Sequence, residues 1–150
     1  MKMLLENHTL TTSKCADFID VTGDVEQTVE RSGVANGMAL VYSPHTTCAI
    51  VINERESGFI RDFEGLIERL VPAEWPYQHD DMTLRTENLD DDDHDVPNGH
   101  AHCKQGLIAS ASQAIPVIDG KLMLGRWQRV FFLELDRPRS RRVLIQVMGE

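Results

Sequence analysis

One segment of the sequence predicts an antiparallel hairpin and so limits the fold to those with antiparallel strands: QAIPVIDGKLMLG (113–125). Two apolar runs flank Asp119 and Gly120, a pair favoured in the tight type I′ turn that joins antiparallel strands. The runs WQRVFFLELD (127–136) and RRVLIQVMG (141–149) follow, and both are rich in the β-branched and aromatic residues typical of strands. We therefore expect the C-terminal part of the chain to form antiparallel strands linked by short turns.

The first half of the chain contains two further strand signals and one clear helix signal. MALVYS (38–43) and TTCAIVINE (46–54) have the composition of strands. In ESGFIRDFEGLIERLVP (56–72), apolar residues recur every three or four positions, which predicts an amphipathic helix that ends at Pro72.

Two shorter segments are candidates for additional helices. DVEQTVERSGV (24–34) and HCKQGLIASAS (102–112) could each form a few helical turns. Strands outnumber helices, so residues 1–150 are expected to form one α+β domain. Its antiparallel, β-sandwich-like sheets would be accompanied by one main amphipathic helix and one or two short helices.

Composition excludes several classes of protein. The 150 residues carry a net charge of −9, whereas a general nucleic-acid binder needs a basic surface. Glu6 and Asn7 interrupt the apolar start of the chain, and no run reaches the roughly 18 apolar residues of a membrane helix. Cys15, Cys48 and Cys103 form an odd set without a CxxC pair, which favours a reducing compartment. We therefore expect a cytoplasmic protein that binds neither nucleic acid nor membrane.

Charge is unevenly divided along the chain. Residues 1–95 contain 20 acidic and 7 basic residues, whereas residues 96–150 contain 4 acidic and 8 basic residues. The basic part could neutralise the acidic part or form a local anion site. Arg141 and Arg142 suit bidentate recognition of phosphate or carboxylate. In a strand they point to opposite faces, so at most one should enter a given pocket.

Histidines from separated segments could hold a metal ion. His45, His102 and either His79 or His94 could together form a catalytic zinc-type site with an open coordination position. The segment DDDDHDVPNGHAHCK (90–104) carries five aspartates. These could hold Mg²⁺ together with substrate phosphates, or they could form only a solvated loop. We therefore expect a divalent metal ion, Zn or Mg.

Strand alternation predicts the surroundings of two further residues. Cys48 would face away from His45 in an extended strand, so it is expected to fill the core rather than share a metal. Glu134 alternates in phase with Val130 and Phe132, which places a carboxylate among apolar neighbours. Such a group needs a partner or a raised pKa, which makes Glu134 a candidate for acid–base chemistry.

Four sequence blocks occur in a recognisable order: HTTCAIVINE, YQHDD, NGHAHCK and IPVIDGKLMLGRWQRVFFLELDRPRSRR. They resemble the YjbQ family, described as secondary thiamine-phosphate synthases, and the resemblance runs from Met1 to Glu150. It implies a small β-sandwich-like α+β fold, a homotrimer and a histidine-lined cleft. It also implies a weak or secondary transferase activity that joins hydroxymethylpyrimidine pyrophosphate to thiazole phosphate and releases pyrophosphate.

The resemblance and the chemistry above together give each candidate residue an expected role. The expected catalytic residues are His45, His102 and Glu134. The expected residues for binding a phosphorylated small-molecule substrate are Asn53, Lys104, Gln128, Arg141 and Arg142, and the expected metal ligands are His45, His79 and His102. Two alternatives stay open: a metal-dependent hydrolase that uses a histidine-bound metal, and a non-catalytic trimeric binding protein for an anionic metabolite.

Overall fold

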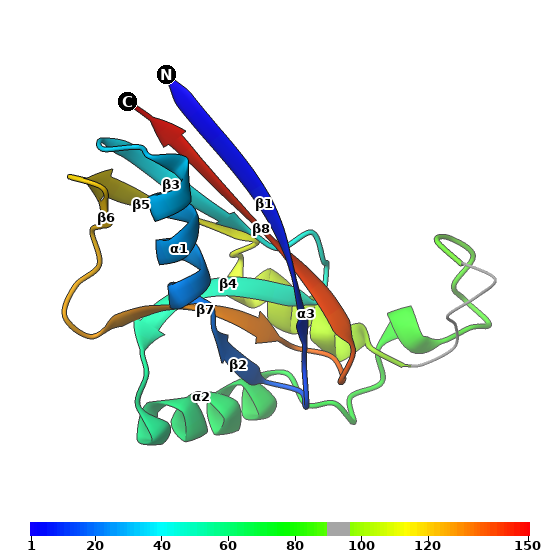
Figure 1. Cartoon of the computed structure of the whole chain (residues 1–150). Helices are drawn as coiled ribbons and strands as arrows, with labels where there is room; N and C mark the ends of the chain where they lie inside the picture. Colours follow the sequence, from blue (N-terminus) through cyan, green and yellow to red (C-terminus); the bar gives the residue numbers. More distant parts are fainter. Residues whose placement is uncertain (90–96) are drawn as a thin grey trace.

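Eight strands and three α-helices make up the part of the chain that the computed structural model describes, residues 1–89 and 97–150 (Figure 1). The strands are β1 (Lys2–Thr11), β2 (Asp17–Asp20), β3 (Gly37–Tyr42), β4 (Cys48–Glu54), β5 (Ser112–Ile118), β6 (Lys121–Leu122), β7 (Gln128–Glu134) and β8 (Ser140–Gly149). The helices are α1 (Thr22–Ser32), α2 (Ser57–Leu70) and α3 (Gly99–Ile108), with a short 3-10 helix, η1 (Gln78–Asp80), before α3. The predicted α+β class is confirmed. The aspartate run and His94 lie outside the described residues.

The strands form two antiparallel sheets. The larger sheet has the order β1-β8-β3-β5-β6, and the smaller has the order β2-β7-β4. In Figure 1, α1 lies against the larger sheet. Helix α2 runs along the smaller sheet, on the side that faces away from the larger sheet. The strands of each sheet pair in antiparallel register throughout, as the sequence predicts.

The smaller sheet is buried on both faces. Phe132 of β7 belongs to the main core, which lies between the two sheets and also contains Val25 of α1. On the opposite face of the same strand, Leu133 packs against Ala101 of α3 and the partly buried Phe63 of α2. Residues 130–134 are therefore all buried, although their side chains alternate between faces.

The helix ends follow local signals. Gly33 ends α1 in the left-handed conformation, with φ of 62°, which glycine adopts without steric strain. The Glu56 carboxylate begins α2 by accepting hydrogen bonds from the backbone N–H groups of Gly58 and Phe59. Among the described helices, none combines the length and apolar character needed to cross a membrane.

The predicted hairpin is confirmed. β5 and β6 pair around Asp119 and Gly120, whose φ values of 51° and 72° are those that a type I′ turn requires. The predicted strands at 38–43, 46–54, 127–136 and 141–149 correspond to β3, β4, β7 and β8. The start of β4 differs, because the structure places Thr46 and Thr47 in the loop with His45 and begins the strand at Cys48.

Sequence patterns missed β1 and β2. β1 turns Leu4, Glu6 and His8 inward and Met3 and Leu5 outward, so its polar and apolar residues do not separate cleanly between the two faces. β2 has only four residues, and all of them are half-buried. In neither segment does the sequence alternate between apolar and polar residues with the period of two that identifies a half-buried strand.

Part of the outer face of the larger sheet is apolar. Met3 of β1 pairs with Met148 of β8, which in turn pairs with Met38 of β3, so these side chains lie on one face. Leu5 and Tyr42 lie on the same face, two and four residues further along their strands. We call the exposed side chains on this face the outer apolar face: Met3, Leu5, Met38, Tyr42 and Ile118.

Candidate functional site

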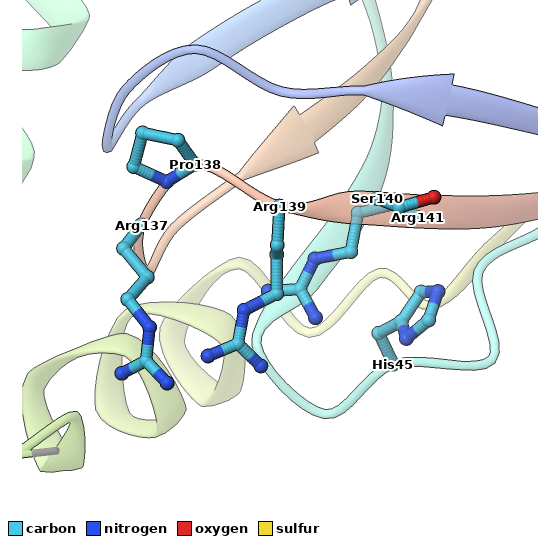
Figure 2. A pocket seen from close by; sticks show the side chains of 6 residues that line it. All are labelled: His45, Arg137, Pro138, Arg139, Ser140 and Arg141. Carbon is cyan, nitrogen blue, oxygen red and sulfur yellow. The ribbon is translucent and has the colours of Figure 1, made fainter. Parts of the chain in front are cut away.

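A pocket of about 560 Å³ lies where the β7–β8 turn meets the loop between β3 and β4. We call it the arginine pocket; its lining residues are His45, Arg137, Pro138, Arg139, Ser140 and Arg141. Figure 2 shows the three guanidinium groups on the same side of the turn, with the His45 imidazole across from them. The described lining residues include three cations and no carboxylate, so the pocket favours an anion.

A buried ion pair fixes Arg141 at the back of this pocket. Its Nε and Nη2 atoms donate to the two Glu134 oxygens at 2.6 and 2.7 Å, and Nη2 also donates to Thr47 Oγ1 at 3.1 Å. Glu134 is fully buried and Arg141 is 5% exposed. The pair joins β7 of the smaller sheet to β8 of the larger one. The buried position predicted for Glu134 is confirmed, and of the two predicted possibilities, a partner or a raised pKa, the structure supplies the partner Arg141.

Glu134 has little capacity left for a ligand. Its Oε1 atom also accepts from the backbone N–H groups of Leu135 and Asp136, at 3.1 and 3.0 Å. Its Oε2 atom accepts from Thr12 Oγ1 at 3.2 Å. Because these donors occupy the carboxylate on every side, the geometry favours a positioning role for Glu134 over proton exchange with a substrate.

The neighbouring Cys48 thiol is inert. Cys48 is fully buried at the start of β4, as the sequence predicts. Burial and the nearby Glu134 carboxylate raise the pKa of this thiol to about 12. A thiol with such a pKa stays protonated at neutral pH, so it is a core side chain rather than a nucleophile.

His45 presents an N–H group to the arginine pocket. Its Nε2 atom accepts a hydrogen bond from the Arg142 backbone N–H at 3.0 Å, so in the neutral ring the proton is on Nδ1. Burial, and then the positive charge of Arg141, lower the pKa of His45 below its ordinary value. His45 is therefore a neutral hydrogen-bond donor at pH 7. Arg142 itself is exposed, so of the two arginines only Arg141 enters the pocket, as alternation predicts.

A second group of polar residues lies at the start of α3. The rings of His79 and His102 have centroids 4.4 Å apart, and His79 Nε2 lies 3.1 Å from Asn98 Oδ1. Asp80 caps the helix, because its Oδ1 atom accepts from the backbone N–H groups of Asn98 and Gly99. We call His79, Asp80, Asn98, His100 and His102 the histidine cluster.

Gly99 allows the close approach that forms the histidine cluster. A Cβ atom at this position would lie 2.5 Å from Tyr77 Cβ, which is too close for any other residue without a shift of the backbone. The helix starts at this glycine, so His100 and His102 diverge. Burial, and then the proximity of His79, lower the pKa of His102.

Asp136 connects the two groups of residues electrostatically. It follows Glu134 closely, is only 6% exposed, and lies 3.4 Å from Arg139 Nη2 through its Oδ2 atom. Its negative charge raises the pKa of both His100 and His102, against the larger effect of burial. The histidine cluster therefore lies close enough to the arginine pocket for Asp136 to act on the charges of both.

The three predicted metal ligands do not form one site in this structure. His79 and His102 lie together, but His45 belongs to the arginine pocket and its Nε2 lone pair is used by the Arg142 backbone. In residues 1–89 and 97–150, no three His, Cys, Asp or Glu side chains are grouped so that they could hold a metal ion. The described residues thus do not fit the three-histidine metal site.

The remaining predicted site residues lie apart from the arginine pocket. Asn53 and Gln128 are at the opposite end of the smaller sheet from Glu134, and each uses its side-chain oxygen to accept a local backbone N–H. Lys104 of α3 is 1% exposed, and its Nζ atom donates to Glu68 of α2 at 2.7 Å. The dense run RPRSRR is a visible sequence signal, but sequence reasoning left open which of Arg137 to Arg142 bind a ligand.

These observations define a small two-sheet α+β protein with an anion-favouring pocket between the β7–β8 turn and the β3–β4 loop. The chain belongs to the family described as UPF0047 protein YjbQ-like, whose model matches residues 6–150. A UPF0047 protein of Archaeoglobus fulgidus is 44% identical over 140 residues, which are 93% of this chain and 98% of that protein. The UPF0047 protein YugU of Bacillus subtilis is 34% identical over 146 residues, which are 97% of this chain and all of that protein. The predicted YjbQ resemblance is confirmed.

Solved structures agree with this family. A YbjQ-like protein of unknown function from Sulfolobus solfataricus superposes with a TM-score of 0.85 and 34% identity, covering 99% of each chain. A hypothetical protein from Aeropyrum pernix gives a TM-score of 0.82 and 37% identity, covering 98% of this chain and 99% of that one. The two sheets and their helices are therefore a fold shared across the family.

The predicted thiamine-phosphate synthase activity is wrong. The family and its relatives carry only a UPF0047 designation, and the Sulfolobus structure is of a protein of unknown function. None of these matches provides evidence for a reaction that joins a pyrimidine pyrophosphate to a thiazole phosphate. Membership of this family defines the fold of the chain but brings no reaction with it.

Proposed function

We propose that this protein binds a small phosphate-bearing molecule in the arginine pocket. The observation that carries the proposal is the convergence of Arg137, Arg139 and Arg141 on one pocket of about 560 Å³. Guanidinium groups bind phosphate oxygens through charge-assisted hydrogen bonds, often two at a time. A phosphate dianion has enough acceptors for several of these donors at once.

The surroundings of Arg141 support this proposal. A long side chain loses conformational entropy when it binds a ligand, which weakens affinity. Arg141 is already ordered by its hydrogen bonds to Glu134 and Thr47, and Asp136 lies beside Arg139. His45 adds a neutral N–H donor at the edge of the pocket. The donors are thus arranged before the ligand arrives.

Calorimetric titration of the purified protein with inorganic phosphate and pyrophosphate tests the proposal. Arg139→Ala and His45→Ala should each weaken binding, the arginine variant by about 10- to 100-fold, because hydrogen bonds to charged groups contribute roughly 1.5–3 kcal/mol. Arg126→Ala is the matched control: it removes the same charge at an exposed position beyond the opposite end of β7. Thermal denaturation of each variant checks that it is folded.

Two results would contradict the proposal. One is equal binding by wild type and Arg139→Ala; the other is an equal loss of affinity in Arg126→Ala. Malonate is a further titrant, because it presents carboxylates instead of phosphate. Tight malonate binding without phosphate binding would reassign the pocket to a carboxylate ligand.

We also propose that the protein assembles as a homotrimer through the outer apolar face. Met3 and Leu5 are 67% and 54% exposed, and Tyr42, on the same face across β8, is 42% exposed. Soluble monomers seldom expose a continuous apolar patch of this kind, and such patches often mark protein–protein contacts. Burial of this face between copies would remove it from water.

A reducing, cytoplasmic location is consistent with the cysteines. Cys15, Cys48 and Cys103 are all free thiols in the structure. Secreted proteins of this size more often pair their cysteines in disulfides. We therefore keep the cytoplasm as the proposed location.

A further inference from the structure

A second pocket, of about 590 Å³, lies between the C-terminal end of α2 and the outer side of α3. We call it the apolar pocket. It is lined by Arg69, Leu70, Val71, Pro72, Trp75, Tyr77, Cys103, Gly106 and Leu107. It shares no lining residue with the arginine pocket, so the two sites can be tested independently.

Large apolar side chains surround this pocket and remain exposed. Leu70 is 62% exposed, and Trp75 and Leu107 are each 63% exposed. These three belong to different segments, namely α2, the loop after it, and α3. A ligand with an apolar body would remove them from water at about 25 cal/mol per Å² buried.

The polar groups available in the apolar pocket are donors. Among the described residues, neither the Arg69 guanidinium nor the Trp75 indole N–H has a hydrogen-bond or ion-pair partner. The Tyr77 hydroxyl already donates to the Pro72 carbonyl at 2.7 Å. None of the described lining residues is acidic. The described lining side chains therefore offer these two donors no carboxylate partner.

Gly106 keeps one wall of the apolar pocket open. A Cβ atom here would have no neighbour within 4 Å, so packing does not require glycine. Glycine inside a helix destabilises it by about 1 kcal/mol relative to alanine. The open backbone at this position instead contributes space to the pocket.

We propose that the apolar pocket binds a small amphiphile, a molecule with an aromatic or aliphatic body and one anionic head group. The body lies against Leu70, Trp75 and Leu107. The head group accepts hydrogen bonds from Arg69 and from the Trp75 indole. This ligand differs in kind from the phosphate compound proposed for the arginine pocket, because most of its contacts are apolar.

Two fluorescent probes of the same shape separate the apolar and ionic parts of this proposal. 8-Anilino-1-naphthalenesulfonate has an aromatic body and an anionic head group, and N-phenyl-1-naphthylamine has the same body without the charge. Arg69→Gln should weaken binding of the anionic probe by about 10-fold and leave the uncharged probe little changed. Arg61→Gln, an exposed site earlier on α2, is the matched control.

A filling variant tests the location of the site. Gly106→Leu puts a side chain into the open wall and favours the helix, so the protein should keep or raise its thermal stability. Saturable binding of both probes should disappear. Gly65→Leu is the control, because Gly65 of α2 also has open space at Cβ and lies outside the pocket.

A third readout uses Cys103, the exposed thiol in the pocket wall. Decanoate should displace the anionic probe and slow alkylation of Cys103 by N-ethylmaleimide in the full-length protein. Unchanged probe binding in Gly106→Leu would overturn the proposal. So would equal effects of Arg69→Gln on both probes, or a wild-type protein that binds neither probe saturably.

Discussion

Glu134 and Arg141 show how a single buried pair can organise a surface pocket. Moving a charge out of water costs several kcal/mol. This pair offsets the cost with two direct hydrogen bonds, with a hydrogen bond that Thr12 donates to Glu134, and with one that Thr47 accepts from Arg141. The result is an arginine whose direction is fixed by the core. Strand alternation predicted the buried carboxylate, but it could not show that all its acceptor sites would be filled.

Glu134→Gln should destabilise the protein by about 3–5 kcal/mol, because it leaves the Arg141 charge buried and uncompensated. The free energy of unfolding from urea titration measures this loss. Glu64→Gln is the control, since Glu64 pairs with Lys14 at the surface and should change stability by only about 0–1 kcal/mol. A Glu134→Gln protein as stable as the control would show that the ion pair does not hold the two sheets together.

At the level of elements, α1 is tied to β1 by a charged cluster around Glu6. The Glu6 carboxylate accepts from Arg31 Nη2 at 2.6 Å and from Thr28 Oγ1 at 2.9 Å, and both donors are on α1. These hydrogen bonds, that from Arg31 first, lower the pKa of Glu6 from 4.5 to about 2. A carboxyl group with a depressed pKa stabilises the fold above its unfolded-state pKa, and the effect is lost as pH falls through its folded-state pKa.

Glu6→Gln should therefore lower the urea midpoint at pH 7, and the difference from wild type should shrink between pH 4.5 and about 2. Urea titrations at several pH values across this window measure the change. Glu26→Gln, at an exposed position on α1, is the control. A difference that stays constant down to pH 2 would rule out the ionised carboxylate as its source.

The elements also show where sequence patterns succeed. The Asp119-Gly120 turn and the apolar repeats of α2, β7 and β8 are local signals, and each gave the correct element. The arginine pocket depends instead on which loops meet, because His45 and the β7–β8 turn are distant in sequence. The metal prediction met the same difficulty: three separated histidines carry no distance information, and only His79 and His102 lie together.

At the level of the whole molecule, the two faces of the larger sheet differ in what covers them. One face packs on α1 and the smaller sheet, whereas the outer apolar face remains exposed in the single chain. Exposed apolar patches on soluble proteins often mark contacts with another surface. The described residues leave the outer apolar face uncovered. We therefore propose that other copies of this chain cover it.

Light scattering coupled to size-exclusion chromatography should give three times the 17.0 kDa mass of the chain. Leu5→Glu places a charge in the outer apolar face and should shift the protein to the monomer, because a buried unpaired charge is strongly unfavourable. Leu66→Glu on α2 is the control, since Leu66 is 47% exposed outside that face. A wild-type monomer, or a Leu5→Glu trimer, would contradict the proposed interface.

The pairing of β1 with β8 also determines when the larger sheet can be completed. Lys2 pairs with Gly149 and Thr11 with Ser140, so β1 can find its partner only after residues 140–149 have been synthesised. Closing a loop that contains nearly the whole chain is entropically slow. Until β8 has been synthesised, the backbone N–H and C=O groups of β1 lack their partner strand, and they can pair with another molecule instead.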